Sequence, residues 1–294
     1  MSNSDLKARY DEYQSDAVNA IVSDFANDGK GRYLLVIPTG GGKTFTAVKS
    51  VCEMYTQGVL DPSSDRILWV AHRHELVQQA SDTFESVISE KSLELKVGEH
   101  IKVEMVSTSK ATLSNDKSIK LIVIDEAHHA AAKSYKPMFE QTRAGVLGLT
   151  ATPSRHDGLP IDFAKESYSI GFPELVRMGI ILRPNIIEVR TGQYDFDGFT
   201  NDDLEQLNDS GRNQRIVQSI IEHKNEFRKI IVYVGTKKHA KELCKLLSAS
   251  TIAKDYDSIS YITGEENSRL QSRADFIQQE KKYKRSILVN VQVL

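Results

Sequence analysis

The chain has 294 residues, a formal net charge of −2, 40% hydrophobic residues and 27% charged residues. These values are typical of a globular protein, and they exclude collagen-like and disordered chains. The near-neutral charge also excludes nucleic-acid binding through bulk basicity, so any such surface is expected to be local.

The first half of the chain alternates helical and apolar strand patterns. Apolar residues at three- and four-residue steps predict a helix from Gln14 to Phe25. Helical stretches then alternate with apolar runs, the strand candidates, at residues 33–37, 67–71, 101–106, 121–124 and 146–149. This alternation predicts an α/β fold, in which a parallel sheet has helices on both faces.

A change of composition divides the chain. Residues 192–211 are rich in Asp, Asn, Gly and Gln and have little apolar periodicity, which indicates a linker-like surface segment. A second strand–helix pattern follows, with helices near 213–227 and 237–247 and strands at 229–234 and 286–291. We expect an amino-terminal domain over residues 1–182 and an incomplete carboxyl-terminal domain over residues 183–294.

The cysteines and the apolar runs bear on the location of the protein. Cys52 and Cys244 lie far apart and match no metal-binding spacing, which favours a reducing, cytoplasmic setting. The amino-terminal residues lack the apolar core of a signal peptide, and no apolar run is long enough to span a bilayer. We therefore expect a cytoplasmic protein with no membrane partner.

A glycine-rich turn follows the first predicted strand and precedes a predicted helix. Its residues are Pro38, Thr39, Gly40, Gly41, Gly42, Lys43 and Thr44. Such a turn points backbone N–H groups at an anion, and the amino terminus of the helix adds partial positive charge. The pattern predicts a phosphate-binding loop in which Lys43 reaches the β- and γ-phosphates and Thr44 ligates Mg²⁺.

An acidic pair follows another predicted strand. Residues 120–124 form an apolar run that ends in Asp125 and Glu126. At the carboxyl end of a buried parallel strand, one carboxylate can hold the metal and the other can position the attacking water. Together with the phosphate loop, Asp125 and Glu126 predict hydrolysis of a nucleoside triphosphate.

With these motifs the chain resembles the superfamily 2 helicases and translocases, in the branch of restriction-enzyme motor subunits and DEAH-box DNA repair helicases. Besides the phosphate loop and residues 125–129, the matching motifs are residues 69–80, 107–109, 149–153 and 231–236. They follow the order of the family over nearly the whole chain. The resemblance implies two RecA-like lobes, of which the second is incomplete, with ATP and Mg²⁺ as cofactors.

The resemblance implies roles for further residues. Gln14 would read the adenine base, His128 would sense the γ-phosphate, and Thr150 and Thr152 would couple the nucleotide state to the nucleic acid. The residues expected to contact the nucleic-acid backbone are His72, Arg73, Thr108 and Thr236. For each of these four, helix capping or an exposed polar role is the alternative.

The resemblance also implies a nucleic-acid partner, and the Thr-Ala-Thr-Pro sequence of residues 150–153 favours DNA over RNA. The fifth motif of the family begins at Leu288 and stops at Leu294, and the sixth, which supplies an arginine finger, is absent. We therefore expect a missing carboxyl-terminal segment or a protein partner to supply that arginine. Two alternatives to a motor remain: a nucleotide-dependent module that binds DNA or protein and hydrolyses ATP weakly, and a transporter-type ATPase.

Overall fold

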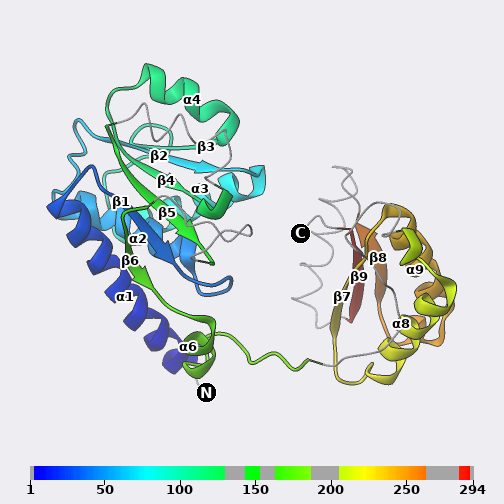
Figure 1. Cartoon of the computed structure of the whole chain (residues 1–294). Coiled ribbons are helices and arrows are strands. Elements are labelled where there is room, and N and C mark those ends of the chain that lie inside the picture. Colours follow the sequence, from blue (N-terminus) through cyan, green and yellow to red (C-terminus); the bar gives the residue numbers. More distant parts are fainter. Residues whose placement is uncertain (1–2, 130–142, 153–162, 187–204, 263–284, 292–294) are drawn as a thin grey trace. The chain divides into compact units, whose positions relative to one another are not determined.

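A computed structural model describes residues 3–129, 143–152, 163–186, 205–262 and 285–291 (Figure 1). The chain divides into two compact units, Met1–Pro184 (unit 1) and Asn185–Leu294 (unit 2). Most of the predicted linker-like segment lies outside the described residues, as do residues 292–294 of the expected fifth motif. Within the described ranges, no helix has the length and apolar character needed to cross a membrane.

Unit 1 is built on a six-stranded sheet with the strand order β3-β2-β4-β5-β1-β6. Every neighbouring pair in this sheet is parallel. The strands are β1 (Arg32–Val36), β2 (Arg66–Ala71), β3 (Ile101–Met105), β4 (Ile119–Ile124), β5 (Gly145–Thr150) and β6 (Lys165–Ser169). The first five match the strand candidates of the sequence. The central strands β1, β2, β4 and β5 are mostly buried and apolar, whereas the edge strand β3 alternates apolar and charged residues and is only partly buried.

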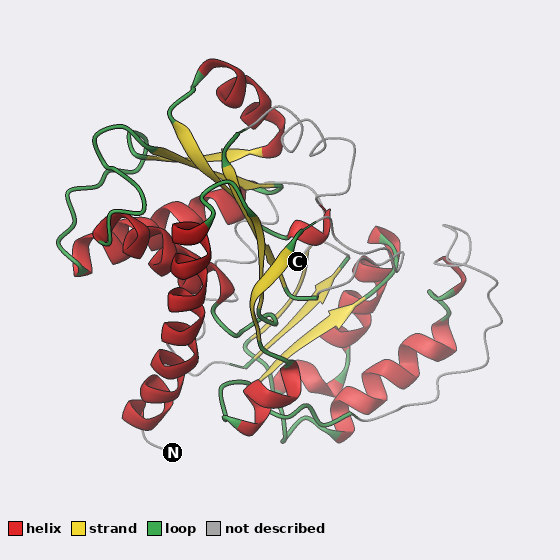
Figure 2. Ribbon diagram, turned by 60° about the vertical axis from the view of Figure 1, so that its left-hand side comes forward, coloured by secondary structure: helices red, strands yellow, loops and turns green. Residues whose placement is uncertain are grey.

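Helices cover both faces of this sheet, as Figures 1 and 2 show. On one face, α1 (Asn3–Asn27), α2 (Lys43–Thr56) and α3 (His74–Glu90) form a core with strand residues such as Trp69, whose ring meets Phe84 edge-on at 5.5 Å between centroids. On the other face, α4 (Val106–Asn115) contributes Val106 and Leu113 to a second cluster. The predicted α/β fold, a parallel sheet between two layers of helices, is confirmed.

Two elements at the edge of unit 1 are absent from the sequence prediction. The edge strand β6 pairs with β1, but its sequence Lys-Glu-Ser-Tyr-Ser is polar and mostly exposed, so no apolar run marks it. The short helix α6 (Phe172–Arg177) follows it, with a proline in its first turn. Both elements lie beside the glycine-rich loop that follows β1.

Unit 2 contains a three-stranded parallel sheet with the order β7-β9-β8. Its strands are β7 (Lys229–Tyr233), β8 (Ser258–Ile262) and β9 (Ser286–Asn290), and its helical elements are α8 (Ser210–Glu222), α9 (Lys237–Ala249) and the 3-10 helix η2 (Thr251–Lys254). The predicted boundaries 213–227 for α8 are wrong. The helix begins earlier because Asp209 caps it, accepting a hydrogen bond from Arg212 N at 3.0 Å, and the predicted linker-like segment therefore overlaps its first two residues.

Candidate active site

The predicted motifs of unit 1 meet at one edge of its sheet. The glycine-rich loop follows β1, Asp125 and Glu126 follow β4, and Thr150 ends β5, which lies between those two strands. Because all these strands are parallel, their carboxyl ends lie at the same edge, where ligands bind in folds of this kind.

The glycine-rich loop has a backbone that side chains would disturb. Gly40 and Gly42 have φ angles of 87° and 82°, in the left-handed region that glycine adopts without strain. Gly41 is held differently, since a Cβ there would lie 2.5 Å from Ile37 Cγ2 and 2.9 Å from Leu175 Cδ1. The three glycines therefore suit the tight turn of a phosphate-binding loop.

Lys43 and Glu126 form the direct link between the two motifs. Lys43 is the first residue of α2, and its Nζ lies 2.8 Å from Glu126 Oε1. The Lys43 side chain is 9% exposed and the Glu126 side chain is 25% exposed, so this pair is partly shielded from water. Glu126 has a φ of 52°, a conformation that non-glycine residues rarely adopt and that is found disproportionately at functional sites.

Asp125 is the most deeply buried carboxylate of the site. Its residue is 2% exposed, its Oδ1 accepts a hydrogen bond from Glu126 N at 2.9 Å, and its own N–H donates to Val70 O at 2.9 Å. Burial raises the pKa of the Asp125 carboxyl to about 6, and the nearby Lys43 ammonium opposes that shift. A bound cation would favour the ionised form that burial disfavours.

The donor set fits Mg²⁺. Asp125 offers a carboxylate and Thr44, the second residue of α2, offers a hydroxyl; Mg²⁺ is commonly bound by one or two carboxylates together with substrate phosphates and water. Among the described residues, no group of three or more His, Cys, Asp or Glu side chains is placed to hold a metal ion. The arrangement thus suits a metal that arrives with a phosphate ligand.

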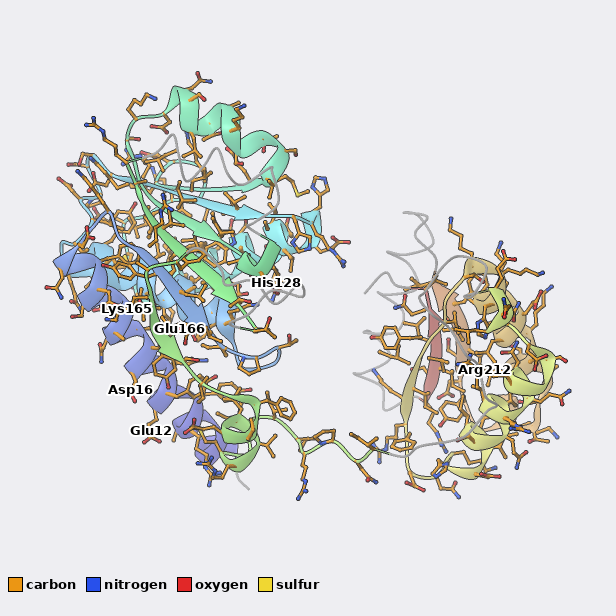
Figure 3. The ribbon with its side chains drawn as sticks, in the orientation of Figure 1. Glu12, Asp16, His128, Lys165, Glu166 and Arg212 are labelled. Carbon is orange, nitrogen blue, oxygen red and sulfur yellow. The ribbon has the colours of Figure 1, made fainter. Side chains whose placement is uncertain are left out.

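His128 connects the acidic pair to β5. It lies in the 3-10 helix η1 (Ala127–His129) and is labelled in Figure 3. Its Nδ1 is 3.3 Å from Glu126 Oε2 and 3.3 Å from Thr150 Oγ1. Thr150 is fully buried, and its hydroxyl donates to Thr152 O at 2.7 Å. The structure therefore brings His128, Thr150 and Thr152 together in a continuous polar chain that begins at Glu126.

Helix α1 lies against the phosphate loop. Gln14 is 3% exposed, and its Nε2 would be 2.7 Å from a Cβ at Gly42. The Tyr13 hydroxyl donates to Gly41 O, and the Tyr10 hydroxyl donates to Gly40 O at 3.3 Å. Gln14 was expected from the family resemblance, whereas the contacts of the two tyrosines with the loop were not, because they join residues far apart in the sequence and no local pattern indicates them.

The loop is also supported by the segment after β6, which the sequence analysis missed. Leu175 of α6 packs against Gly41, Ile181 lies near Gly40, and Arg9 of α1 donates to Met178 O at 2.6 Å. These contacts join residues far apart in the sequence, so no local pattern announces them. Thr39 is exposed at the start of the loop.

Three of the four predicted nucleic-acid contacts belong to unit 1. His72 and Arg73 follow β2, and Thr108 lies in the first turn of α4 after β3, so the three share the carboxyl edge of neighbouring strands. Thr108 donates its hydroxyl to Met105 O at 3.0 Å. Thr236 belongs to unit 2, where it caps α9 by accepting a hydrogen bond from His239 N at 3.1 Å. Thr108 and Thr236 therefore have local structural roles of the kind that the sequence left open as alternatives.

Comparisons with known proteins point to one protein family. Residues 7–155 match the family described as "Type III restriction enzyme, res subunit". The chain is 26% identical to the putative mitochondrial ATP-dependent helicase irc3 of Schizosaccharomyces pombe, over 96% of this chain and 49% of that protein. It is 31% identical over 150 residues to the DNA 3'-5' translocase XPB2 of Sulfurisphaera tokodaii, which covers 50% of this chain and 31% of that protein. The chain spans about half the length of the first relative and less of the second.

A solved structure supports the fold. A Saccharomyces cerevisiae Dbp5 complex that contains ADP aligns with a TM-score of 0.50 and 14% identity, over 99% of this chain and 76% of that chain. At this identity the likeness concerns the fold alone, and it confirms the predicted RecA-like architecture.

Proposed function

The chain belongs to the family of the type III restriction enzyme res subunit, among the superfamily 2 helicases, and from this premise we propose that it is part of an ATP-dependent helicase or translocase acting on DNA. The observation that carries the proposal is the contact of 2.8 Å between Lys43 of the phosphate loop and Glu126 of the acidic pair. The contact puts the Lys43 ammonium beside the Glu126 carboxylate at the sheet edge, which supports the proposal that Lys43 binds phosphate and that Glu126 positions water.

Different residues of unit 1 have different proposed roles in hydrolysis. The backbone of Gly40, Gly41 and Gly42 and the Lys43 ammonium would hold the phosphates. Thr44 and Asp125 would hold Mg²⁺, which would supply positive charge beside the γ-phosphate. Glu126 would position the water for in-line attack. Because Glu126 Oε1 lies 2.8 Å from Lys43 Nζ, phosphate oxygens that bind Lys43 would compete with this carboxylate and leave it to face the water.

Coupling to the nucleic acid runs from Glu126 through His128. Its ring nitrogen contacts both the Glu126 carboxylate and the Thr150 hydroxyl, so a change at Glu126 would reach Thr150 and Thr152 through direct polar contacts. His72, Arg73, Thr108 and Thr236 are the proposed contacts to the strand, made largely to phosphates and without reading sequence. Gln14 is proposed to select adenine.

DNA is the proposed partner rather than RNA. The Thr-Ala-Thr-Pro sequence at residues 150–153 supports this choice, and so does the similarity to a protein named as a DNA translocase. We propose a cytoplasmic location because Cys52 and Cys244 are both free and buried, as is usual in a reducing compartment.

Steady-state ATP hydrolysis with and without DNA tests the proposal. Lys43→Ala should lower hydrolysis by about 100-fold or more because it removes the charge fixed on the phosphates. Lys49→Ala is the matched control, since Lys49 lies in the same helix and pairs only loosely with Asp11, at 3.8 Å; it should leave the rate within about twofold.

The same assay compares the rate of ATP hydrolysis in the presence of duplex DNA, single-stranded DNA and RNA. The proposal expects the largest stimulation from DNA. Retained hydrolysis in Lys43→Ala would refute the site assignment. ATP binding and DNA binding with no stimulated hydrolysis would favour the nucleotide-dependent binding module instead.

A further inference from the structure

The amino edge of the unit 1 sheet carries a cleft of about 800 Å³. Its walls come from the turn after α1, the end of α2, and the segments that precede β4 and β5. These segments enter the strands, whereas the candidate active site is formed by segments that leave them. In a parallel sheet the cleft and the active site therefore lie at opposite edges.

The floor of the cleft is apolar. Phe25, Met54, Ile119, Leu121 and Ala144 line it, and each of these residues is at most 7% exposed. The wall is tightly built, because a Cβ at Gly145 would lie 2.6 Å from Gly29 O. Concave sites with buried apolar walls and a few polar groups at the rim are the usual form of binding pockets.

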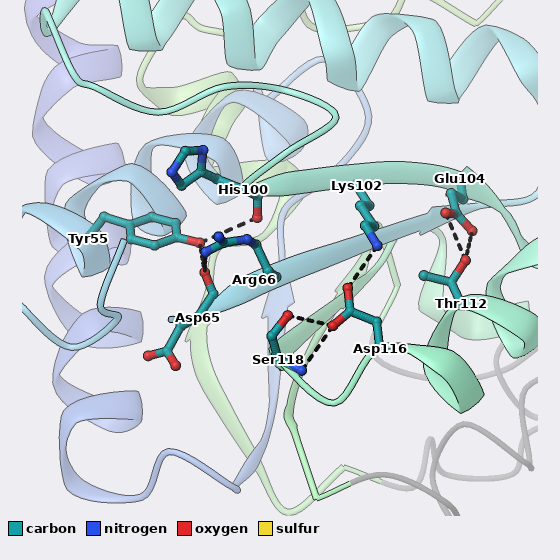
Figure 4. A network of polar contacts seen from close by, with 9 residues as sticks. All are labelled: Tyr55, Asp65, Arg66, His100, Lys102, Glu104, Thr112, Asp116 and Ser118. Carbon is teal, nitrogen blue, oxygen red and sulfur yellow. Dashed lines mark hydrogen bonds and ion pairs between the residues drawn. The ribbon is translucent and has the colours of Figure 1, made fainter. Parts of the chain in front are cut away.

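The acidic residues of the rim are already satisfied within the chain. Asp116 accepts from Lys102 at 2.8 Å and from Ser118, as Figure 4 shows, and these bonds lower its pKa to about 2. Asp65 accepts from Asp61 N at 3.0 Å, and Asp28 accepts from Lys30 N at 3.0 Å.

The basic residues of the rim are not satisfied in the same way. Lys30, Lys117, Lys120 and Arg143 line the cleft and are exposed. Within the part of the chain that the structure describes, none of these four side chains has an ion pair with a carboxylate. The cleft thus combines a buried apolar floor with cationic groups that are available to a ligand.

We propose that this cleft is a docking site for a protein partner, which inserts a bulky apolar side chain into the floor and places carboxylates against Lys30, Lys117, Lys120 and Arg143. The floor supplies the anchoring contact typical of interface hot spots, and the rim supplies charge complementarity. A nucleic-acid backbone fits less well, since its phosphates gain nothing from an apolar floor and would meet Asp28, Asp65 and Asp116. Because the cleft lies at the opposite edge from Lys43, the partner can bind without closing the nucleotide site.

Fluorescence anisotropy with the full chain tests this docking site. The probe is a short fluorescein-labelled peptide with a central Leu-Phe pair between Glu-Asp pairs, and a second peptide has Ser-Ser at its centre. The first peptide should bind saturably, and the Ser-Ser peptide should bind at least about tenfold more weakly. The double variant Lys30→Glu, Lys117→Glu should weaken the first peptide by about tenfold or more.

The matched control is Lys96→Glu, Lys110→Glu, which reverses two exposed lysines of unit 1 outside the cleft and should change the affinity by less than about twofold. Circular dichroism melting of both variants verifies that they are folded. Equal losses in the two variants, or equal affinity for the two peptides, would overturn the proposal. The proposal would also be overturned if the first peptide did not bind and a labelled DNA duplex did, with an affinity that fell in the Lys30→Glu, Lys117→Glu variant.

Discussion

Asp125 shows how burial and function oppose each other at a single residue. Burial raises the pKa of its carboxyl to about 6, yet a metal ligand must be ionised. In the proposed site, binding of Mg²⁺ would therefore compete with a proton at this residue. The resulting pH dependence of Mg-ATP binding would come from the titration of Asp125 and not from a change in the whole fold.

Binding of Mg-ATP should weaken as the pH falls below about 6, approaching tenfold for each further pH unit, because the protonated Asp125 carboxyl is a poor metal ligand. Titration with a fluorescent ATP analogue over this range, with and without Mg²⁺, measures the effect. The dependence should be much smaller without Mg²⁺. An affinity that stays constant through this range in the presence of Mg²⁺ would contradict the assignment of Asp125.

Replacing Asp125 should also stabilise the free chain. Its folded pKa lies above the ordinary value of 3.8, so its contribution to stability is present at low pH and is lost as the pH rises toward 6. At neutral pH the buried charge costs about 1–3 kcal/mol, which Asp125→Asn removes. A higher melting temperature without nucleotide, together with lost Mg-ATP binding, is the expected result.

Asp116→Asn is a control variant that should change the melting temperature in the opposite direction. Its pKa is lowered to about 2 by Lys102 and Ser118, so its stabilising effect is present above the ordinary pKa of 3.8 and is lost as the pH falls toward 2. Its replacement should lower the melting temperature at neutral pH. If both variants shift melting in the same direction, the account of Asp125 is wrong.

At the scale of elements, α8 and α9 of unit 2 are joined by a buried polar chain. His239 Nε2 lies 2.8 Å from Asn213 Oδ1, Asn213 Nδ2 donates to Asn208 Oδ1 at 2.8 Å, and Asn208 Nδ2 donates to Glu242 at 2.7 Å. Asn213 and His239 are each 2% exposed, and burial lowers the pKa of His239. A neutral His239 that donates from Nε2 fits this chain of bonds.

Asn213→Ala should destabilise unit 2 by about 1–3 kcal/mol, because it leaves His239 Nε2 buried without an acceptor. Faster amide hydrogen exchange in α8 and α9 measures this loss. Asn225→Ala changes an exposed asparagine of the same unit and should have little effect. Equal exchange in the two variants would show that the buried chain does not hold the helices together.

The burial and polarity of each element explain which elements could be predicted from the sequence. The strands β1, β2, β4 and β5 could be found because they are central strands whose residues are mostly buried and apolar. The edge strand β3 has the sequence Ile-Lys-Val-Glu-Met and is marked by the alternation of apolar and charged residues. The edge strand β6 could not be found, since its residues 165–169 are polar, and β8, with the sequence Ser-Ile-Ser-Tyr-Ile, lacks a continuous apolar run. The contacts of α6 with the phosphate loop depend on strand order, which sequence spacing does not contain.

The candidate site was more predictable than its surroundings. Glycines followed by a lysine, and two acidic residues after an apolar run, are local patterns whose meeting point follows from parallel strands. The support that Tyr13 and Leu175 give to Gly41 is tertiary, and no spacing indicates it. Thr236 was predicted from motif order, but sequence alone could not separate a nucleic-acid contact from the capping role that the structure gives it.

At the scale of the whole molecule, the proposed function needs a nucleotide site in unit 1 and contacts with DNA from both units. Within unit 1, Lys43, Glu126, His128 and Thr150 form one connected set of contacts. The longer relatives that this chain covers only in part are named as a putative ATP-dependent helicase and a DNA translocase. The proposed step on which both hydrolysis and coupling depend is the release of Glu126 from Lys43 toward water.

Single-turnover hydrolysis by Glu126→Gln, measured beside Mg-ATP affinity with DNA present, tests this step most directly. The account predicts an affinity that is unchanged or tighter, because Lys43 loses a competing carboxylate while Asp125 still holds the metal, and a turnover lowered by about 100-fold. Glu94→Gln, a change at an exposed residue of unit 1, should leave both quantities unchanged. A wild-type turnover rate in Glu126→Gln, or affinity lost in proportion to the rate, would contradict the central claim.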